Sequence, residues 1–418
     1  MTEVRDRGII LTTKGRALLK DALSGRLDKD GKKWTFLKLA TQSGVSDKTI
    51  SRVINGTQAV DENTIRAIAT ALEISFDKKL APLIQRFQTT PDIIGTLSEN
   101  PFTSGLPVSA DRFYGRKRTI ADLKNRIGAR SAQCINLVGL RRSGKTSMLQ
   151  YVQARSELFF APGQNPLIVL LDLQDGRYHS PIGMIEGLRV GIAAVLDEEP
   201  WTREQNDDAF AIEDGLEAVR DRGYRLIVML DELEAIGRRL EEFQDWGEDW
   251  RSKASAGLFA LVIATGRSLG EVYGSLGLTS PFDNIFSKTM LGALELADWQ
   301  QLVLDGLPGV SEAQLDWINE VSGGWAFYVQ MAATIVLQEN DLNEAEREFR
   351  FQADDRFREL WKDLKPEEQR SIRDLVQAGT AIGDGMGDRL LRYGVLRQDG
   401  RLFSSMFGEW IRENGGAV

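Results

Sequence analysis

The stretch Gly139–Thr146 places two glycines, two arginines and a lysine directly after the apolar run Gln133–Val138. It fits the phosphate-binding pattern GxxxxGKT, in which glycines let backbone N–H groups converge on phosphate oxygens. In that pattern Lys145 neutralises the β- and γ-phosphates, and the Thr146 hydroxyl binds Mg²⁺. A helix expected at Ser147–Arg155 would add the positive end of its dipole. The pattern therefore predicts ATP and Mg²⁺ as cofactors, with these contact residues: Gly139, Arg142, Ser143, Gly144, Lys145, Thr146 and Ser147.

Two carboxylates follow another apolar run, Arg225–Leu230, at the point where a strand of a parallel sheet would end. Open α/β sheets bind their ligands at this carboxyl edge. We expect Asp231 to bind Mg²⁺ together with Thr146, and Glu232 to orient and polarise the attacking water. Glu234 either supports this pair or simply begins the next helix, and we favour the second interpretation. An acidic pair downstream of a phosphate-binding loop makes ATP hydrolysis the expected chemistry.

Four apolar runs must position these residues: Gln133–Val138, Leu167–Leu173, Arg225–Leu230 and Phe259–Ala264. Continuous apolar runs are typical of strands that are buried on both faces of a parallel sheet. The spacing of Ile120, Leu123 and Ile127 predicts a helix before the first strand. The sequence thus predicts an α/β core around the phosphate-binding loop.

Three short motifs resemble those of archaeal-type ATPases and STAND-class NTPases: Phe113–Arg116, Ser280–Phe286 and Gly323–Phe327. In those families the first segment lies across the adenine, which implies nucleotide contacts for Gly115 and Arg116. The third motif departs from the families, because His-Pro usually follows the glycines and this chain has Trp325–Ala326. A proline that relatives place beside the nucleotide is therefore missing, which leaves nucleotide exchange and the hydrolysis rate open.

The same resemblance implies a role for Thr265, which follows the run Phe259–Ala264. Related ATPases carry at this place a polar residue that senses the γ-phosphate. For Arg267 three alternatives stay open: it contacts phosphate in its own subunit, acts as an arginine finger on a neighbouring subunit, or pairs with an acid. The candidate catalytic residues are therefore Lys145, Asp231, Glu232 and Arg267.

Residues 35–54 have apolar positions spaced for two short helices, with Gly44 at the turn between them and Ser46 as the N-cap of the second. The motifs that mark this segment are Leu39–Ala40, Gly44–Ser46, Ile50–Ser51 and Asn55–Gly56. Together they resemble the phage-repressor type of helix-turn-helix, and Thr64–Ser75 resembles the helix that closes that domain. The sequence therefore predicts an all-α head.

The resemblance implies that the second helix enters the major groove of double-stranded DNA. The implied DNA contacts are Ser46, Asp47, Lys48, Thr49, Arg52 and Asn55. One such module binds weakly, so we expect a homo-oligomer, at least a dimer on a paired site. The alternative is a head that mediates dimerisation or packs on the ATPase.

The charge distribution supports a polyanion contact at one end of the chain. The net charge is −9, yet residues 1–80 carry 15 basic against 10 acidic residues, so the remaining residues carry −14. The single cysteine, Cys134, excludes an internal disulfide and fits a small buried residue in a reducing compartment. No signal-peptide pattern and no apolar stretch of membrane-spanning length occurs. We expect a cytoplasmic protein that does not bind membranes.

The periodicity of the rest of the chain predicts its domains. The head is expected at 1–79, followed by a linker at 80–112 with one helical piece around Leu80–Phe87. The P-loop ATPase core is expected at 113–292, a helical lid at 293–360 and a winged helix at 361–418. The winged helix either binds DNA or packs on the nucleotide domain, and we favour packing.

The leading hypothesis is an ATP-controlled DNA-binding regulator that hydrolyses ATP slowly, as a switch between its ATP and ADP states. The first alternative is a STAND-type signalling or antiphage-defence ATPase that oligomerises and recruits a separate effector protein. The second is a transposition-type ATPase that remodels DNA. The oligomeric state with a non-hydrolysable ATP analogue distinguishes the three hypotheses.

Overall fold

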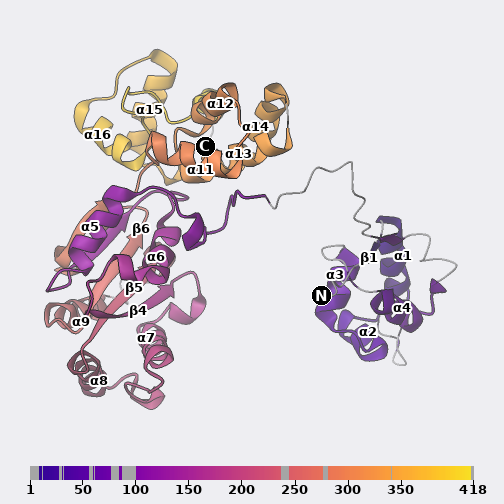
Figure 1. The fold of residues 1–418 in the computed structure, drawn as a ribbon, viewed down its shortest axis with the longest axis horizontal. Helices are drawn as coiled ribbons and strands as arrows, with labels where there is room; N and C mark the ends of the chain where they lie inside the picture. Colours follow the sequence, from indigo (N-terminus) through magenta and orange to yellow (C-terminus); the bar gives the residue numbers. More distant parts are fainter. Residues whose placement is uncertain are drawn as a thin grey trace. The chain divides into compact units, whose positions relative to one another are not determined.

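A computed structural model describes the chain over most of its length. The described residues are 9–11, 13–27, 31, 33–55, 60, 62–76, 84–86, 100–236, 244–275, 281–339 and 341–415. The chain divides into two compact units, Met1–Leu97 and Ser98–Val418, which we call the head and the body (Figure 1). In the described residues, no helix is both long and apolar enough to cross a membrane.

The head is a helical unit closed by a short two-stranded ribbon. Its helices enclose buried apolar side chains that include Leu39, Ile50 and Ile68. The ribbon pairs β1 (Ile9–Leu11) antiparallel with β2 (Ile84–Arg86). The helix expected around Leu80–Phe87 is therefore wrong over Ile84–Arg86, because these residues pair with a distant strand. The helices are α1 (Thr13–Ser24), α2 (Phe36–Ser43), α3 (Asp47–Asn55) and α4 (Glu62–Ala71).

The body contains a five-stranded sheet with the order β4-β5-β6-β3-β7, in which all neighbouring strands are parallel (Figure 1). Since parallel strands end at the same edge, the phosphate-binding loop after β3 and the acids after β5 lie on one side of the sheet. The strands are β3 (Cys134–Val138), β4 (Asn165–Asp172), β5 (Tyr224–Asp231), β6 (Ala260–Thr265) and β7 (Phe286–Met290).

Helices cover both faces of the sheet. Buried residues of α5 and α6 share one apolar cluster with β3, β5 and β6. Residues of α7, α8 and α9 share a second cluster with the alternate strand positions. The α/β core with a parallel sheet is thus confirmed. The helices are α5 (Lys117–Ile127), α6 (Lys145–Ala154), α7 (Pro181–Leu196), α8 (Ala209–Asp221), α9 (Gln244–Ser255) and α10 (Leu269–Ser275).

A helical C-terminal region, orange to yellow in Figure 1, follows the sheet. An isolated bridge joins Leu396 and Leu402 between its last two helices. The region has one continuous apolar core, which includes Tyr328, Phe357 and Phe403. The helices are α11 (Leu296–Gly306), α12 (Glu312–Ser322), α13 (Ala326–Gln338), α14 (Leu342–Asp363), α15 (Pro366–Ala378), α16 (Asp384–Tyr393) and α17 (Ser405–Asn414).

Trp325, which follows Gly323 and Gly324, is part of this core. Its ring stacks on Phe403 with centroids 5.1 Å apart, and its Nε1 donates to the Gly394 carbonyl at 2.6 Å. Gly323 has a φ of 52°, and a Cβ there would lie 2.2 Å from the Phe403 carbonyl oxygen. Gly323 and Trp325 therefore join the start of α13 to the residues between α16 and α17.

Candidate nucleotide site

The phosphate-binding loop begins α6 with a backbone that only glycine adopts easily. Gly144 is the N-cap of α6 and has a φ of 98°. Lys145 follows it, and its side chain is 4 % exposed although it carries a charge. Its Nζ donates to the Gly139 carbonyl at 3.0 Å and lies 3.7 Å from the Glu232 Oε1. A buried ammonium group with this few partners suits a further anionic ligand.

The loop also contains an unused polar atom. The Ser143 Oγ is buried and, among the described residues, has no hydrogen-bond partner. A Cβ at Gly139 would lie 2.4 Å from this oxygen and 2.7 Å from the Leu291 carbonyl oxygen, so only glycine fits there. An orphaned hydroxyl beside a buried lysine fits a phosphate-binding loop that gains its partner from a ligand.

The acids after β5 lie beside this loop. Burial raises the pKa of Asp231, and a hydrogen bond from Thr146 opposes that shift. The Asp231 Oδ1 accepts from the Glu232 N–H at 3.0 Å. Glu232 has a φ of 54°, an uncommon conformation for a residue with a side chain, and its carboxylate faces Lys145. Thr146 and Asp231 could therefore hold a divalent cation, with Glu232 beside it.

Glu234 lies in the short helical turn that follows β5, as the favoured interpretation expected, and its side chain also contacts the segment after β6. Its Oε1 accepts from the Gly266 N–H, and its Oε2 is buried without a hydrogen-bond partner among the described residues. Burial raises the pKa of Glu234. This carboxyl connects the end of β5 with the segment that follows β6.

Thr265 is fully buried at the end of β6, and its hydroxyl accepts from the Asn136 Nδ2 at 2.7 Å. The Asn136 Oδ1 in turn accepts from the Leu269 N–H at 3.1 Å. Sequence reasoning missed Asn136, although a single polar residue inside an apolar strand is a usable signal. Thr265 is held here by protein groups, and γ-phosphate sensing stays a prediction.

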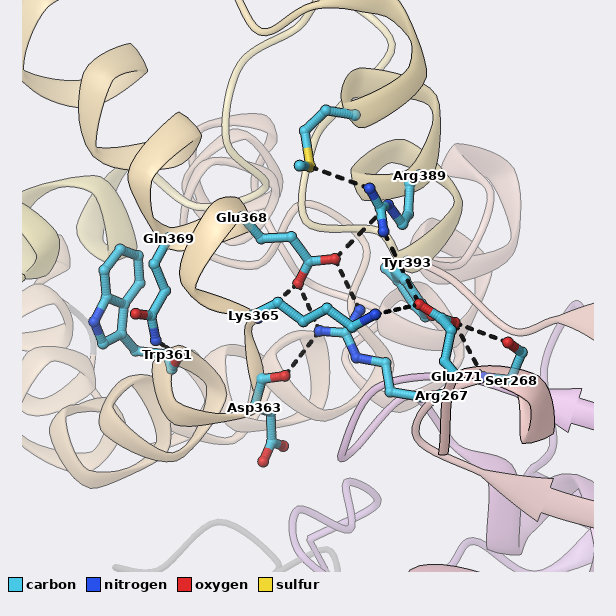
Figure 2. A network of polar contacts seen from close by, with 11 residues as sticks. Arg267, Ser268, Glu271, Trp361, Asp363, Lys365, Glu368, Gln369, Arg389 and Tyr393 are labelled. Atoms are coloured by element: carbon cyan, nitrogen blue, oxygen red, sulfur yellow. Dashed lines mark hydrogen bonds and ion pairs between the residues drawn. The ribbon is translucent and has the colours of Figure 1, made fainter. Parts of the chain in front are cut away.

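Of the three roles considered for Arg267, the structure shows pairing with an acid. Its guanidinium donates to both carboxylate oxygens of Glu368, at 2.9 and 2.6 Å, and to the Asp363 carbonyl at 2.8 Å (Figure 2). Its catalytic role stays a prediction, since this arrangement turns the side chain toward α14 and α15.

Arg116 lies against the phosphate-binding loop. It is the N-cap of α5 with a φ of 61°, and its guanidinium donates to the carbonyls of Gly292, Ala293 and Ser143. Burial lowers the pKa of Arg116 to about 10, so it stays protonated at neutral pH. Gly115 has a φ of 69°, and a Cβ there would lie 2.4 Å from an Asp298 carboxylate oxygen.

A pocket of about 280 Å³ lies above the loop. Of the predicted nucleotide and catalytic residues, it is lined by Arg116, Arg142, Ser143, Gly144, Lys145, Thr146, Ser147 and Glu232. Gly115, Gly139, Asp231, Thr265 and Arg267 do not line it but lie in adjoining segments.

Part of the predicted linker forms a wall of this pocket. We call residues 100–108 the strap, and all of its residues from Thr103 to Val108 except Ser104 line the pocket. The Thr103 N–H donates to the Gln330 Oε1 of α13 at 2.7 Å, and the Val108 N–H donates to the Ser147 Oγ of α6 at 3.2 Å. The strap therefore connects the C-terminal helices with the helix that begins at the phosphate-binding loop.

The predicted DNA contacts lie on or before α3 of the head. The Ser46 Oγ accepts from the Thr49 N–H at 3.1 Å, which is the N-cap bond expected from the sequence. Asp47 is exposed in the first turn of the helix. The side chains of Lys48, Arg52 and Asn55 lie outside the described residues, and their DNA contacts stay predictions.

The head matches the helix-turn-helix family profile over residues 31–79. The body is similar to a Walker-type ATPase of Pyrococcus abyssi, with a TM-score of 0.54 and 14% identity over 75% of this chain and 99% of that one. The ORC1 protein of Aeropyrum pernix in complex with DNA aligns with a TM-score of 0.42 and 14% identity, covering 74% and 95%. No curated protein matches. The chain thus combines a helix-turn-helix head with a P-loop ATPase fold.

Proposed function

We propose that this protein is a DNA-binding regulator whose head is controlled by ATP bound in the body, and that it hydrolyses ATP slowly. The observation that carries the proposal is the pocket over the phosphate-binding loop. There the buried Lys145 lies 3.7 Å from Glu232, and Thr146 is bonded to Asp231. The helix-turn-helix head supplies the contact with double-stranded DNA.

The body residues have separate roles in this proposal. Lys145 and the backbone of the loop would bind the phosphates, while Thr146 and Asp231 would hold Mg²⁺, which neutralises phosphate charge. Glu232 would accept a proton from the attacking water, since its carboxylate projects beside Lys145. Arg116 fixes the loop through the Ser143 carbonyl.

The strap supports the coupling between nucleotide and head. It is the part of the body that follows the head in the chain, and it lines the pocket. ATP can bias the head only by the difference in its affinity for two arrangements, and about 1–3 kcal/mol is the usual scale of such coupling. A strap that contacts the ligand in one arrangement and not the other would supply this difference.

Sequencing the DNA fragments retained by the purified protein, with and without ATP, tests the proposal. We expect enrichment of a paired sequence motif and a change of at least about fivefold in its retention on adding ATP. Retention that shows no sequence preference, or that is identical in both conditions, would remove regulation of DNA binding from the account.

The contacts between Arg267 and the C-terminal helices favour a second candidate, a STAND-type signalling or defence ATPase that oligomerises when these helices are released. Light scattering with a non-hydrolysable ATP analogue separates the candidates. A dimer supports the regulator, and a large closed ring supports the signalling ATPase, for which a separate effector protein would be sought. A filament that forms only on DNA would indicate a remodelling ATPase.

A further inference from the structure

Three arginines near the phosphate-binding loop are each paired with an acid from the C-terminal region. We call Glu359, Asp363 and Glu368, which lie at the end of α14 and the start of α15, the acidic row. The Arg142 guanidinium donates to Glu359 at 2.7 Å, and Arg141 lies 3.7 Å from the Asp363 carboxylate. Arg267 binds Glu368, as described above. The positive charge that the sequence gathers at the loop is thus shared with protein carboxylates.

Glu368 is the most deeply placed member of the acidic row. Its side chain is fully buried, and it accepts both bonds from Arg267 (Figure 2). It also accepts from the Lys365 N–H at 2.9 Å, and Arg389 lies 3.9 Å away. Since a buried carboxylate that loses its cation is strongly destabilised, Arg267 cannot leave Glu368 unless the surroundings of Glu368 change as well.

The end of α14 presents negative charge to the same arginines. Asp363 is the last residue of this helix, where carbonyl groups and the helix dipole are negative. Its carbonyl accepts from Arg267, and burial raises the pKa of its carboxyl, a shift that the charges of Arg141, Lys145 and Arg267 oppose. The positive charge of Lys145 in the loop therefore also favours the ionised form of the Asp363 carboxyl.

Arg142 shows that the loop itself is shaped by the acidic row. It has a φ of 66°, and besides the bond to Glu359 its guanidinium lies over the Phe327 ring at 4.7 Å from the centroid. Arg141 and Arg142 both line the pocket. Their charged ends are paired with α14 in this arrangement.

We propose that the acidic row is an internal competitor for the triphosphate: it occupies the arginines that would otherwise add to phosphate binding, and so lowers the affinity for ATP. This inference rests on the proposed function, because it assumes that the pocket binds a nucleotide. A triphosphate in the pocket weakens the hold of Arg141 and Arg142, which line it, on Asp363 and Glu359. Release of these two acids strengthens triphosphate binding to the same degree. ADP, with one phosphate fewer, competes less well.

A second set of contacts keeps the C-terminal region docked independently of these arginines. Glu271 of α10 accepts from the Lys365 Nζ at 2.8 Å and from the Ser268 Oγ at 2.9 Å. Although burial acts in the opposite direction, these bonds lower the pKa of Glu271 to about 2. The bond between Lys365 and Glu271 involves neither Glu359 nor Asp363, so neutralising these two acids changes the charge at the pocket while this brace remains.

The test is calorimetric titration of the full chain with inorganic tripolyphosphate, with Mg-ATP and with Mg-ADP at fixed ionic strength. The triple variant E359Q/D363N/E368Q keeps the side-chain shapes and removes three charges. We expect it to bind tripolyphosphate and ATP at least about tenfold more tightly than the wild type, and to gain less for ADP. D363N alone, which keeps the buried Glu368, should gain roughly threefold and guards against misfolding of the triple variant.

The matched control is E344Q on the same helix, where Glu344 is bonded to Arg347 at the other end of α14. It should bind all three ligands as the wild type does. If the wild type binds ATP and both acidic-row variants bind it with unchanged or weaker affinity, the competitor proposal is wrong while the proposed function stands. If neither the wild type nor the variants bind any of the three ligands, both proposals fall.

Discussion

At the residue scale, the site depends on charged groups that the fold holds out of water. Lys145 and Asp231 are both buried, and the Ser143 Oγ has no hydrogen-bond partner among the described residues. Such groups cost free energy in the absence of a ligand, which is typical of sites that bind one.

Asp231 should reduce the stability of the protein at neutral pH, because burial raises its pKa and so disfavours the ionised form in the folded state. Asp231→Asn should raise the Tm by roughly 2 °C at pH 7.5. The gain should shrink as the pH falls through the raised pKa, where the wild-type carboxyl becomes protonated without the substitution. Calorimetry across pH checks this, with Asp214→Asn at an exposed position of α8 as the control. A lower Tm for Asp231→Asn at pH 7.5 would contradict it.

Lys145 and Glu232 should separate binding from chemistry. Lys145→Ala should weaken ATP binding roughly 30-fold or more, since it removes the buried cation. Glu232→Gln should retain ATP and slow hydrolysis at least about 100-fold, because the amide cannot accept the proton of water. Fluorescent-nucleotide titration and phosphate release measure the two effects. Glu217→Gln on the surface of α8 is the control, and equal hydrolysis in wild type and Glu232→Gln would show that water activation is misassigned.

The sequence predicted the residues of the loop and the acids after β5, because their types and spacing are fixed by phosphate and metal chemistry. It did not indicate that Arg267 would pair with Glu368, 101 positions further along the chain. It also missed Asn136, whose amide joins β3 to Thr265 and Leu269. Such partners are brought together by tertiary packing, so the spacing of residues along the chain does not predict them.

At the element scale, the four apolar runs were recognised because strands buried on both faces need apolar residues throughout. The fifth strand, β7, lies at the edge of the sheet and has the sequence FSKTM. Because this sequence contains polar residues, it is not a continuous apolar run and was not predicted as a strand. The residues Ile84–Arg86 were missed for a related reason, since a three-residue strand is defined by its partner at Ile9–Leu11. The P-loop core and the helix-turn-helix were predictable, whereas short pairings were not.

Ser46 should stabilise the head through its cap on α3. Ser46→Ala removes the acceptor of the Thr49 N–H and should lower the free energy of unfolding of the head by about 1 kcal/mol. Thr41→Ala on the exposed side of α2 should change it by less than about 0.5 kcal/mol. Hydrogen exchange of the head amides in the full chain measures both. Equal protection in the two variants would show that the cap contributes nothing.

At the scale of the whole molecule, the predicted DNA contacts and the pocket over the phosphate-binding loop lie in different units. The variant Lys48→Ala/Arg52→Ala should lose sequence-specific DNA retention in a gel shift and keep its ATP affinity within about twofold, since the pocket residues all lie in the body. Lys20→Ala on α1 is a basic-residue control. Unchanged DNA binding by the double variant would show that Lys48 and Arg52 do not mediate the predicted contact with DNA.

Cys134 lies inside the sheet, where it is 7 % exposed and its Sγ accepts from the Leu261 N–H. Because this thiol is buried, maleimide dyes would leave it largely unreacted under native conditions, and the chain has no other cysteine. A fluorophore pair could therefore be attached through two engineered surface cysteines, one in each unit, without replacing Cys134. Single-molecule energy transfer on such a chain would test directly whether ATP changes the distance between the head and the body.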